Sequence, residues 1–320
     1  MGKFKDLLRQ SFKSADTEEW IDVHYTRPIG LVFALLWNRL GVHPNVVTLL
    51  SIALGVGSAF MFYHTDLTHN IWGVVLLMFA NFCDSTDGQM ARITGKKSLL
   101  GRILDGVASG LWFAAIYVAL GLRMDGQYML GTDHHWGVVI WGFVVISSSL
   151  CHSPQSSLAD YYRQIHLYFL KGKDGSELDS STKLWETYRQ LRKDQWFERL
   201  YYAFYANYSA SQERRTPAFQ RFFSLWSKNA NGIGLEKKET IRRRFLDGSR
   251  PLMRHANILS FNVRALCLYA ACLLNQPILY FLFEIIVLTV IYVYMHHTHE
   301  TLCKGLAETL ETAPNETPTT

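Results

Sequence analysis

Apolar positions along this chain gather in long runs instead of alternating with polar ones. The runs without any charged residue are 40–63, 67–83, 106–122, 136–159, 265–283 and 285–298. A helix needs about 20 apolar residues to cross the hydrocarbon core of a bilayer. The pattern therefore predicts an all-α, polytopic membrane protein with a six-helix transmembrane bundle. The predicted spans are 44–64, 68–90, 101–122, 136–157, 256–275 and 277–298.

Two further segments complete the predicted organisation. Residues 28–40 are apolar and capped by Arg39, which favours an interfacial helix before the first span. The stretch 158–255 is too long for a simple connection, so we expect a cytoplasmic helical insertion there. The predicted division is an N-terminal interfacial segment 1–43, spans one to four in 44–157, the insertion 158–255, spans five and six in 256–299, and a cytoplasmic tail 300–320.

Composition supports the membrane class, and the distribution of charge orients it. Hydrophobic residues make up 49% of the chain and charged residues only 18%, below the ~25% of soluble domains. Residues 156–255 hold 19 Lys and Arg against 11 Asp and Glu, while 64–70, 123–135 and 275–277 together hold one Arg and no Lys. Basic loops stay in the cytoplasm. We therefore expect a multi-pass protein of a bacterial inner membrane, with both termini cytoplasmic.

The basic segment 156–255 also bears on partners. It interleaves Lys and Arg with many aromatic residues, a combination that suits either nucleic acid or an anionic membrane surface. In a chain with six predicted spans the membrane surface is favoured, so no nucleic-acid partner is expected.

A polar motif lies at the predicted cytoplasmic end of span two and the start of span three. Asp84 and Asp87 are three residues apart and share a helix face, and Asp105 follows in the next span. Carboxylates are costly beside hydrocarbon, so three of them at one end of a bundle indicate a cation site. Oxygen donors without neighbouring His or Cys favour Mg²⁺, Mn²⁺ or Ca²⁺.

The order D-x2-D-G-x2-A-R-x8-G-x3-D, from Asp84 to Asp105, resembles the signature of the CDP-alcohol phosphotransferase (CDP-alcohol phosphatidyltransferase) family, and the resemblance covers residues 40–125. It implies a membrane enzyme of phospholipid or phosphosphingolipid synthesis. Such an enzyme transfers a phospho-lipid group from a CDP-activated lipid, of the CDP-diacylglycerol or CDP-ceramide type, to a polar alcohol and releases CMP. The resemblance also implies a homodimer in the lipid bilayer.

Individual residues take their expected roles from this resemblance. It implies that two Mg²⁺ or Mn²⁺ ions are held by Asp84, Asp87 and Asp105 at a cytoplasmic active site. It also implies a CDP-binding set, which consists of Asp84, Gly88, Ala91, Arg92 and Gly101.

Ser109 departs from the family pattern, which has a fourth Asp at this position. The resemblance implies that this Asp is the base that deprotonates the attacking alcohol. A serine hydroxyl is far too weakly basic for that task at neutral pH. Three interpretations stay open: an engineered or catalytically impaired variant, a divergent enzyme whose base is His152 or the substrate's own phosphate, and a protein that binds CDP-lipid without turnover.

The acceptor alcohol is indicated by basic residues. Arg264 lies within span five, where a buried charge either is functional or pairs with a backbone carbonyl or another buried group. With Arg163 and Arg254 it would suit a phosphorylated alcohol, and the chain is faintly similar to bacterial family members that use inositol phosphate. The competing class is a cation-coupled transporter. Against it, the carboxylates lie near one surface and not near the midplane, where transporter sites concentrate.

Overall fold

A computed structural model describes residues 14, 16–95, 99–129, 131–228 and 234–312. Every regular element among these residues is a helix, and one isolated β-bridge joins Tyr128 to His135 between two of the helices. The chain divides into two compact units, which are described separately. The first comprises Met1–Pro154 and Phe261–Thr289, and the second comprises Gln155–Ser260 and Val290–Thr320.

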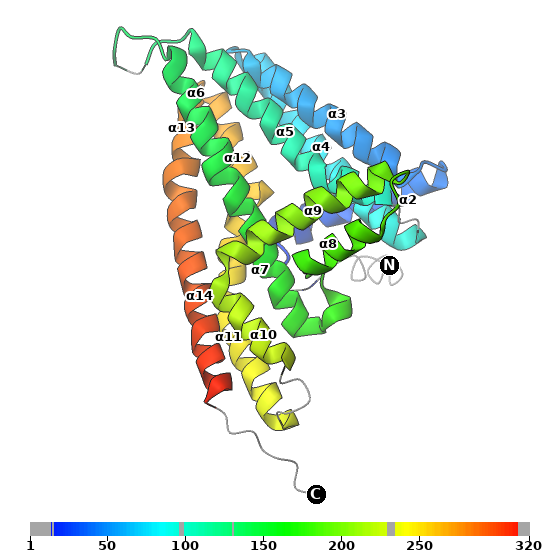
Figure 1. Ribbon diagram of the computed structural model, residues 1–320. Helices are drawn as coiled ribbons and strands as arrows, with labels where there is room; N and C mark the ends of the chain where they lie inside the picture. The colour runs from blue at the N-terminus through cyan, green and yellow to red at the C-terminus, as the bar shows by residue number, and fades with distance from the viewer. Residues whose placement is uncertain (1–13, 15, 96–98, 130, 229–233, 313–320) are drawn as a thin grey trace, which may run out of the picture. The chain divides into compact units, whose positions relative to one another are not determined.

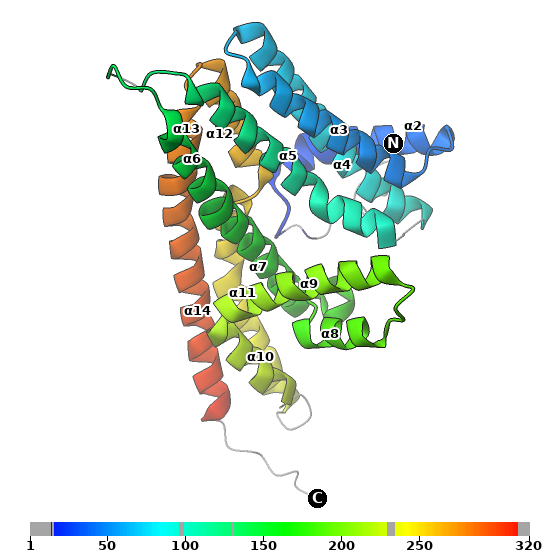
Figure 2. The same cartoon turned by 45° about the horizontal axis from the view of Figure 1, so that its top comes forward.

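The first unit is built around α3, α4 and α5, which lie side by side in Figures 1 and 2. Short π-helical segments, labelled η, interrupt or precede several of its α-helices. In chain order the elements are η1 (Asp22–Thr26), α2 (Arg27–Arg39), α3 (Pro44–Tyr63), α4 (Leu67–Thr94), α5 (Leu99–Asp125), α6 (Gly137–Val145), η2 (Ile146–His152), α12 (Phe261–Leu273), α13 (Ile278–Leu282) and η5 (Phe283–Leu288).

Local sequence signals fix the ends of α3 and α4. Pro44 opens α3, where its missing N–H costs nothing, and His43 Nδ1 accepts a hydrogen bond from the Asn45 N–H. Asp66 caps α4 by accepting from the His69 N–H at 3.1 Å. Gly95, with φ of +68°, ends α4 in the left-handed conformation that glycine adopts most easily. The Asp84–Arg92 motif therefore falls in the last turns of a well-defined helix.

Close packing of α3 against α5 forms the core of this unit. Trp112 of α5 is 1% exposed and lies against Gly55 of α3, where an added Cβ would come within 2.1 Å of the indole. Phe62 packs in the same way against Gly73 of α4. Ile116 and Leu120, one and two turns after Trp112, continue the buried face of α5. Two glycines thus allow α4 and α5 to approach α3 closely.

Among the described residues, five helices are long and apolar enough to cross a membrane: Pro44–Tyr63, Ile103–Asp125, Gly137–Lys171, Glu236–Leu273 and Ile278–Glu311. They support the predicted integral membrane protein. Helix α4, which contains the predicted span 68–90, is not among them, because its charge-free run 67–83 includes His69 and Asn70 and ends at Asp84. The six-span count, the interfacial position of α2 and the cytoplasmic orientation stay predictions.

The second unit is also helical. Its elements are α7 (Ser153–Lys171, whose first two residues belong to the first unit), the 3₁₀ turn η3 (Lys173–Gly175), α8 (Ser181–Gln190), α9 (Trp196–Arg215), α10 (Pro217–Lys228), α11 (Leu235–Ile258) and α14 (Thr289–Glu311, whose first residue belongs to the first unit). Helices α8 and α9 lie side by side (Figure 2). Contacts among the rings of Phe169, Phe222 and Phe245 join α7, α10 and α11.

The predicted division of the chain can be compared with these elements only in part. Residues 1–13 and 15 of the predicted N-terminal segment 1–43, and residues 313–320 of the predicted tail 300–320, lie outside the described residues. Within the described part, α14 continues to Glu311, so residues 300–311 are helical. The predicted boundaries stay predictions.

Candidate metal and nucleotide site at the ends of α4 and α5

Three carboxylates predicted from the sequence lie together in the first unit. Asp84 and Asp87 come from the last turns of α4, and Asp105 comes from the early turns of α5. One carboxylate oxygen of each lies within 4.8 Å of the others. Asp87 is buried, Asp84 is half-buried and Asp105 is exposed, so the group has a closed side and an open side. This arrangement allows a ligand to reach the carboxylates from outside the helix bundle.

The buried oxygens of this group fit a divalent cation. Asp84 Oδ1 and Asp87 Oδ2 are both buried, and neither has a hydrogen-bond partner among the described residues. A buried polar atom without a partner costs about 1–3 kcal/mol, and more when the group is charged. A hard divalent ion satisfies such oxygens directly. The donor set therefore suits Mg²⁺ or Mn²⁺, although the identity of the ion and the roles of the three residues stay predictions.

Residues from α2 and α3 support the α4 end of the site. Thr48 of α3 lies close enough to Asp87 to interact with its carboxylate, and Gln89 Nε2 donates to the Arg27 carbonyl at 3.1 Å. A Cβ at Gly30 of α2 would lie 3.0 Å from Gln89 Nε2, so the two helices touch there. The sequence analysis missed these contacts. A threonine or glycine in an apolar run carries no signal of the partner that it will meet.

The predicted CDP-binding residues border the carboxylates. The Arg92 guanidinium lies over Gly88, 3.5 Å from where a Cβ would be, and interacts electrostatically with Asp105 and Asp87. Ala91 follows Asp87 by one turn of α4, and Gly101 precedes Asp105 by one turn of α5. Small residues and one cation thus surround the acidic group. Such an arrangement can accommodate a diphosphate, and the individual roles stay predictions.

Ser109 lies one turn after Asp105 on α5 and is exposed. A Cβ added at Gly106 or at Gly110 would meet nothing within 4 Å. The family's base position therefore faces open space, with room for a substrate and with a neutral hydroxyl in place of a carboxylate.

His152, the predicted alternative base, belongs to a separate polar cluster. Its Nδ1 lies 3.0 Å from the Tyr117 hydroxyl and 3.3 Å from Glu284 Oε1, and its ring contacts Phe113 at 4.4 Å between centroids. Phe113 and Tyr117 follow Ser109 by four and eight residues, about 6 and 12 Å along the helix axis. His152 is thus held one to two turns beyond the base position.

Arg264 belongs to the same cluster. Its Nη1 donates to Glu284 Oε1 at 2.5 Å, and the Tyr280 hydroxyl donates to the same oxygen at 2.8 Å. Tyr117 also donates to Glu284. Arg264 is 1% exposed and Glu284 is fully buried. The charge of the predicted acceptor-binding arginine is therefore matched inside the protein.

The other two predicted acceptor residues lie in the second unit. Arg163 Nη2 donates to Asn257 Oδ1 at 2.8 Å and also to the Ser260 hydroxyl. Arg254 is exposed on α11. Their combination with Arg264 at one acceptor stays a prediction.

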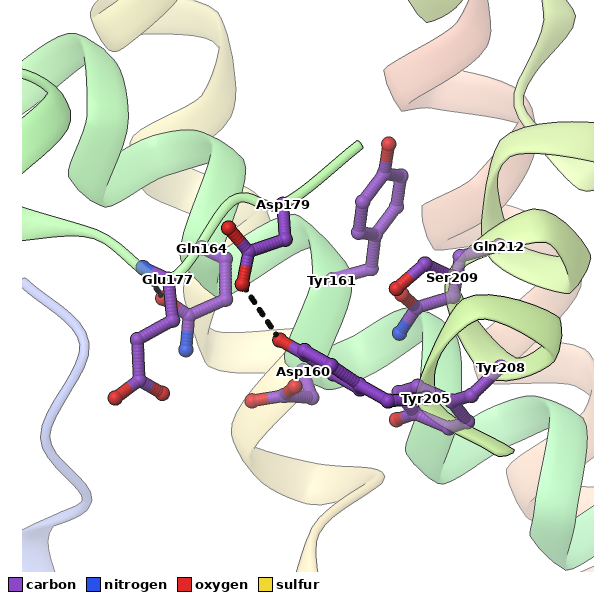
Figure 3. A pocket seen from close by; sticks show the side chains of 9 residues that line it. All are labelled: Asp160, Tyr161, Gln164, Glu177, Asp179, Tyr205, Tyr208, Ser209 and Gln212. Carbon is purple, nitrogen blue, oxygen red and sulfur yellow. Dashed lines mark hydrogen bonds between the residues drawn. The ribbon is translucent and has the colours of Figure 1, made fainter. Parts of the chain in front are cut away.

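The second unit also contains an open hollow with an empty volume of about 330 Å³, shown in Figure 3. The Tyr205 hydroxyl donates to Asp179 at 3.1 Å across it. Burial, followed by the Asp179 charge, raises the pKa of Tyr205, and burial raises the pKa of Tyr208 to about 12. Both phenols therefore stay neutral at physiological pH. Three carboxylates and no basic side chain line this hollow, so it does not suit a pyrophosphate; the lining residues are Asp160, Tyr161, Gln164, Glu177, Asp179, Tyr205, Tyr208, Ser209 and Gln212.

Comparison with known proteins bears on the first unit. Residues 41–153 match the family model described as CDP-alcohol phosphatidyltransferase. This segment belongs to the CDP-alcohol phosphatidyltransferase family. The match begins where the resemblance was expected to begin, but it continues past residue 125 through α6 and η2 and includes His152. Family membership thus extends over the predicted fourth span.

Several curated proteins are similar over the same region. A Mycobacterium tuberculosis protein provisionally named a cardiolipin synthase is 30% identical over 111 residues, which cover 35% of this chain and 46% of that protein. A Streptomyces avermitilis phosphatidylinositol phosphate synthase is 34% identical over 29% of this chain and 38% of its own. A Pyrococcus horikoshii archaetidylinositol phosphate synthase is 32% identical over a stretch that covers 28% of this chain and 53% of that protein.

These relatives support the expected similarity to inositol-phospholipid-synthesising members. The chain spans about half or less of the length of each of these curated relatives. No solved structure matches the chain.

Proposed function

We propose that this protein transfers a phospho-lipid group from a CDP-activated lipid to a polar alcohol and releases CMP. The observation that carries the proposal is the convergence of Asp84, Asp87 and Asp105 within a segment of the CDP-alcohol phosphatidyltransferase family. In this reaction the alcohol oxygen forms a bond to the lipid-bearing phosphorus. The bond from that phosphorus to the CMP oxygen breaks, and CMP leaves with the electron pair.

The three carboxylates would hold Mg²⁺ or Mn²⁺, in keeping with two ions per site. Bound there, the ions would neutralise the diphosphate and the developing charge on CMP. Arg92, which lies over Gly88 beside the acidic group, would contact a phosphate of the donor. Gly88, Ala91 and Gly101 would leave space for the cytidine diphosphate at the ends of α4 and α5.

The proton of the attacking alcohol needs an acceptor other than Ser109. His152 is a poor candidate, because its ring lies against Phe113 and its Nδ1 lies close to Tyr117 and Glu284. A phosphate carried by the acceptor alcohol brings its own base to the reaction. We therefore propose a phosphorylated alcohol such as inositol phosphate as the acceptor class, consistent with the printed names of two relatives.

The direct test is CMP release by the purified protein. The assay combines CDP-diacylglycerol or CDP-ceramide, Mg²⁺ or Mn²⁺, and paired acceptors that differ only in their phosphate, such as inositol and inositol phosphate. We expect CMP release that depends on the metal and on the phosphorylated acceptor. Release with neither acceptor would overturn the proposal, and equal release with both would remove the role assigned to the acceptor phosphate.

Two other functions would give different experimental results. A CDP-lipid-binding variant would bind the donor in a metal-dependent way and release no CMP. A cation-coupled transporter would carry a solute into liposomes and would not need CDP-lipid. The enzyme is favoured over the transporter, because the carboxylates occur at the ends of α4 and α5 and not at mid-helix.

A further inference from the structure

A second group of possible metal ligands lies in the first unit, at the other end of α4 from the acidic motif. His64 ends α3, Asp66 caps α4 and His69 lies in the first turn of α4. One ligand atom from each lies within 4.8 Å of the others. The two imidazole rings are in contact, with 4.2 Å between centroids and 32° between their planes. From this geometry we propose that His64, Asp66 and His69 bind one divalent transition-metal ion.

The carboxylate orients one of the two histidines. Asp66 Oδ2 lies 2.7 Å from His69 Nδ1, and Oδ1 accepts from the His69 backbone N–H at 3.1 Å. An ion that replaces the proton between Nδ1 and Oδ2 would bind the His69 ring and the Asp66 carboxylate together.

Hydrogen bonds from Asn70 and Arg123 hold the backbone of the short connection between α3 and α4. Asn70 Nδ2 donates to the carbonyls of His64 and Asp66, at 3.1 and 2.6 Å. Asn70 Oδ1 accepts from Arg123 Nη1 at 2.8 Å, and the buried Arg123 also donates to the Phe62 carbonyl at 2.8 Å. The loop is therefore tied to the end of α5. Such support holds the ligands in place before the ion arrives and so lowers the entropic cost of binding.

The chemistry of the donors selects the class of ion. Imidazole nitrogens favour Zn²⁺, Cu²⁺ and Ni²⁺ over the Mg²⁺ and Mn²⁺ that suit an all-carboxylate group. Ligands of a tetrahedral zinc ion lie about 3.4 Å apart at bond lengths near 2.1 Å, so small rotations of these side chains would close the site. His69 and Asp66 are 43% and 52% exposed, which leaves a path for the ion and a position for water.

The test is calorimetric titration of the tag-free, full-length protein with Zn²⁺ in excess Mg²⁺, which keeps the other carboxylates occupied. We expect one zinc ion per chain. The double substitution His64→Ala/His69→Ala should abolish this binding, and Asp66→Asn should weaken it by at least about 10–100-fold, since loss of a ligand should cost no less than loss of a carboxylate behind a metal-bound histidine. The matched control His134→Ala removes an exposed histidine of another loop and should leave binding unchanged.

Two results would overturn the site: Zn²⁺ binding that persists at the same affinity in the double variant, or a wild-type protein that binds no Zn²⁺ in excess Mg²⁺. Size-exclusion profiles and thermal unfolding without zinc show whether the variants stay folded. Cobalt supplies a second readout, since its visible spectrum reports coordination at the site. Neither measurement uses CMP release, so the outcome is independent of the proposed transferase activity.

Discussion

Arg264 and Glu284 form an ion pair inside the first unit, with Arg264 Nη1 2.5 Å from Glu284 Oε1. Both side chains are almost completely buried, at 1% and 0% exposure. Tyr117 and Tyr280 complete the hydrogen bonding of the carboxylate. An arginine whose charge is matched in this way has little capacity left for an acceptor phosphate. The pair therefore favours a structural role for Arg264 over the acceptor-binding role predicted from its position in span five.

The first prediction separates these two roles. Arg264→Ala should lower the free energy of unfolding by about 3–5 kcal/mol, because it leaves a buried carboxylate without its partner. Thermal unfolding in detergent measures this loss. The double variant Arg264→Met/Glu284→Gln removes both charges and should recover most of the stability. A stable single variant with normal donor binding and weaker acceptor binding would instead support the acceptor role.

Hydropathy predicted much of the helical architecture, because long apolar runs and capping residues act locally. The predicted span 44–64 corresponds closely to α3, Pro44–Tyr63, since Pro44 and the polar residues after Tyr63 mark its ends. The predicted span 256–275 is less simple: α11 ends at Ile258 and α12 begins at Phe261. Neither this break nor the π-helical segments η2 and η5 has a hydropathy signal.

The candidate site was predictable only as far as the motif reaches. Asp84, Asp87 and Asp105 come together because helical spacing and antiparallel packing of neighbouring helices place them at one end. The proximity of Thr48 to Asp87 and the Arg264–Glu284 pair depend on which faces of distant helices meet. One sequence does not reveal such pairings, so the partner of Arg264 was not predicted.

A second prediction concerns the packing that positions α5. Gly55→Ala should destabilise the protein by about 1–3 kcal/mol, the usual cost of overpacking, because the new methyl would lie 2.1 Å from the Trp112 indole. Gly57→Ala on the same helix is the matched control, since its Cβ would meet Leu76 at an ordinary 3.8 Å. Thermal unfolding of the two variants compares them directly. Equal stability would contradict the close contact between α3 and α5.

A third prediction concerns the metal. Asp87→Asn should lower CMP release by at least about 100-fold, since loss of a ligand should cost no less than loss of an outer partner. The matched control Asp133→Asn changes an exposed aspartate in the connection before α6 and should have no effect. Chelation by EDTA should abolish release by the wild type, and added Mg²⁺ or Mn²⁺ should restore it. Full activity of Asp87→Asn would exclude this residue from the metal site.

The last prediction concerns Ser109, whose surroundings leave room for a carboxylate, since Gly106 and Gly110 face open space. If this position has lost its base, Ser109→Asp should raise CMP release at neutral pH by about 10²–10⁴-fold, the usual contribution of a positioned base. The gain should be greatest with an unphosphorylated alcohol, because a phosphorylated acceptor already supplies a proton acceptor. Ser109→Asn is the matched control, with the same shape and no basicity, and should give no gain.

His152→Ala completes this test. Under the proposed mechanism it should leave the dependence on the acceptor phosphate unchanged, since the His152 ring is engaged with Phe113, Tyr117 and Glu284. Its effect on stability, measured by thermal unfolding, separates loss of the cluster from loss of a base. A large fall in turnover with normal stability and normal donor binding would instead identify His152 as the relocated base. A rate that is the same for phosphorylated and unphosphorylated acceptors, in the wild type and in this variant, would show that neither group takes the proton.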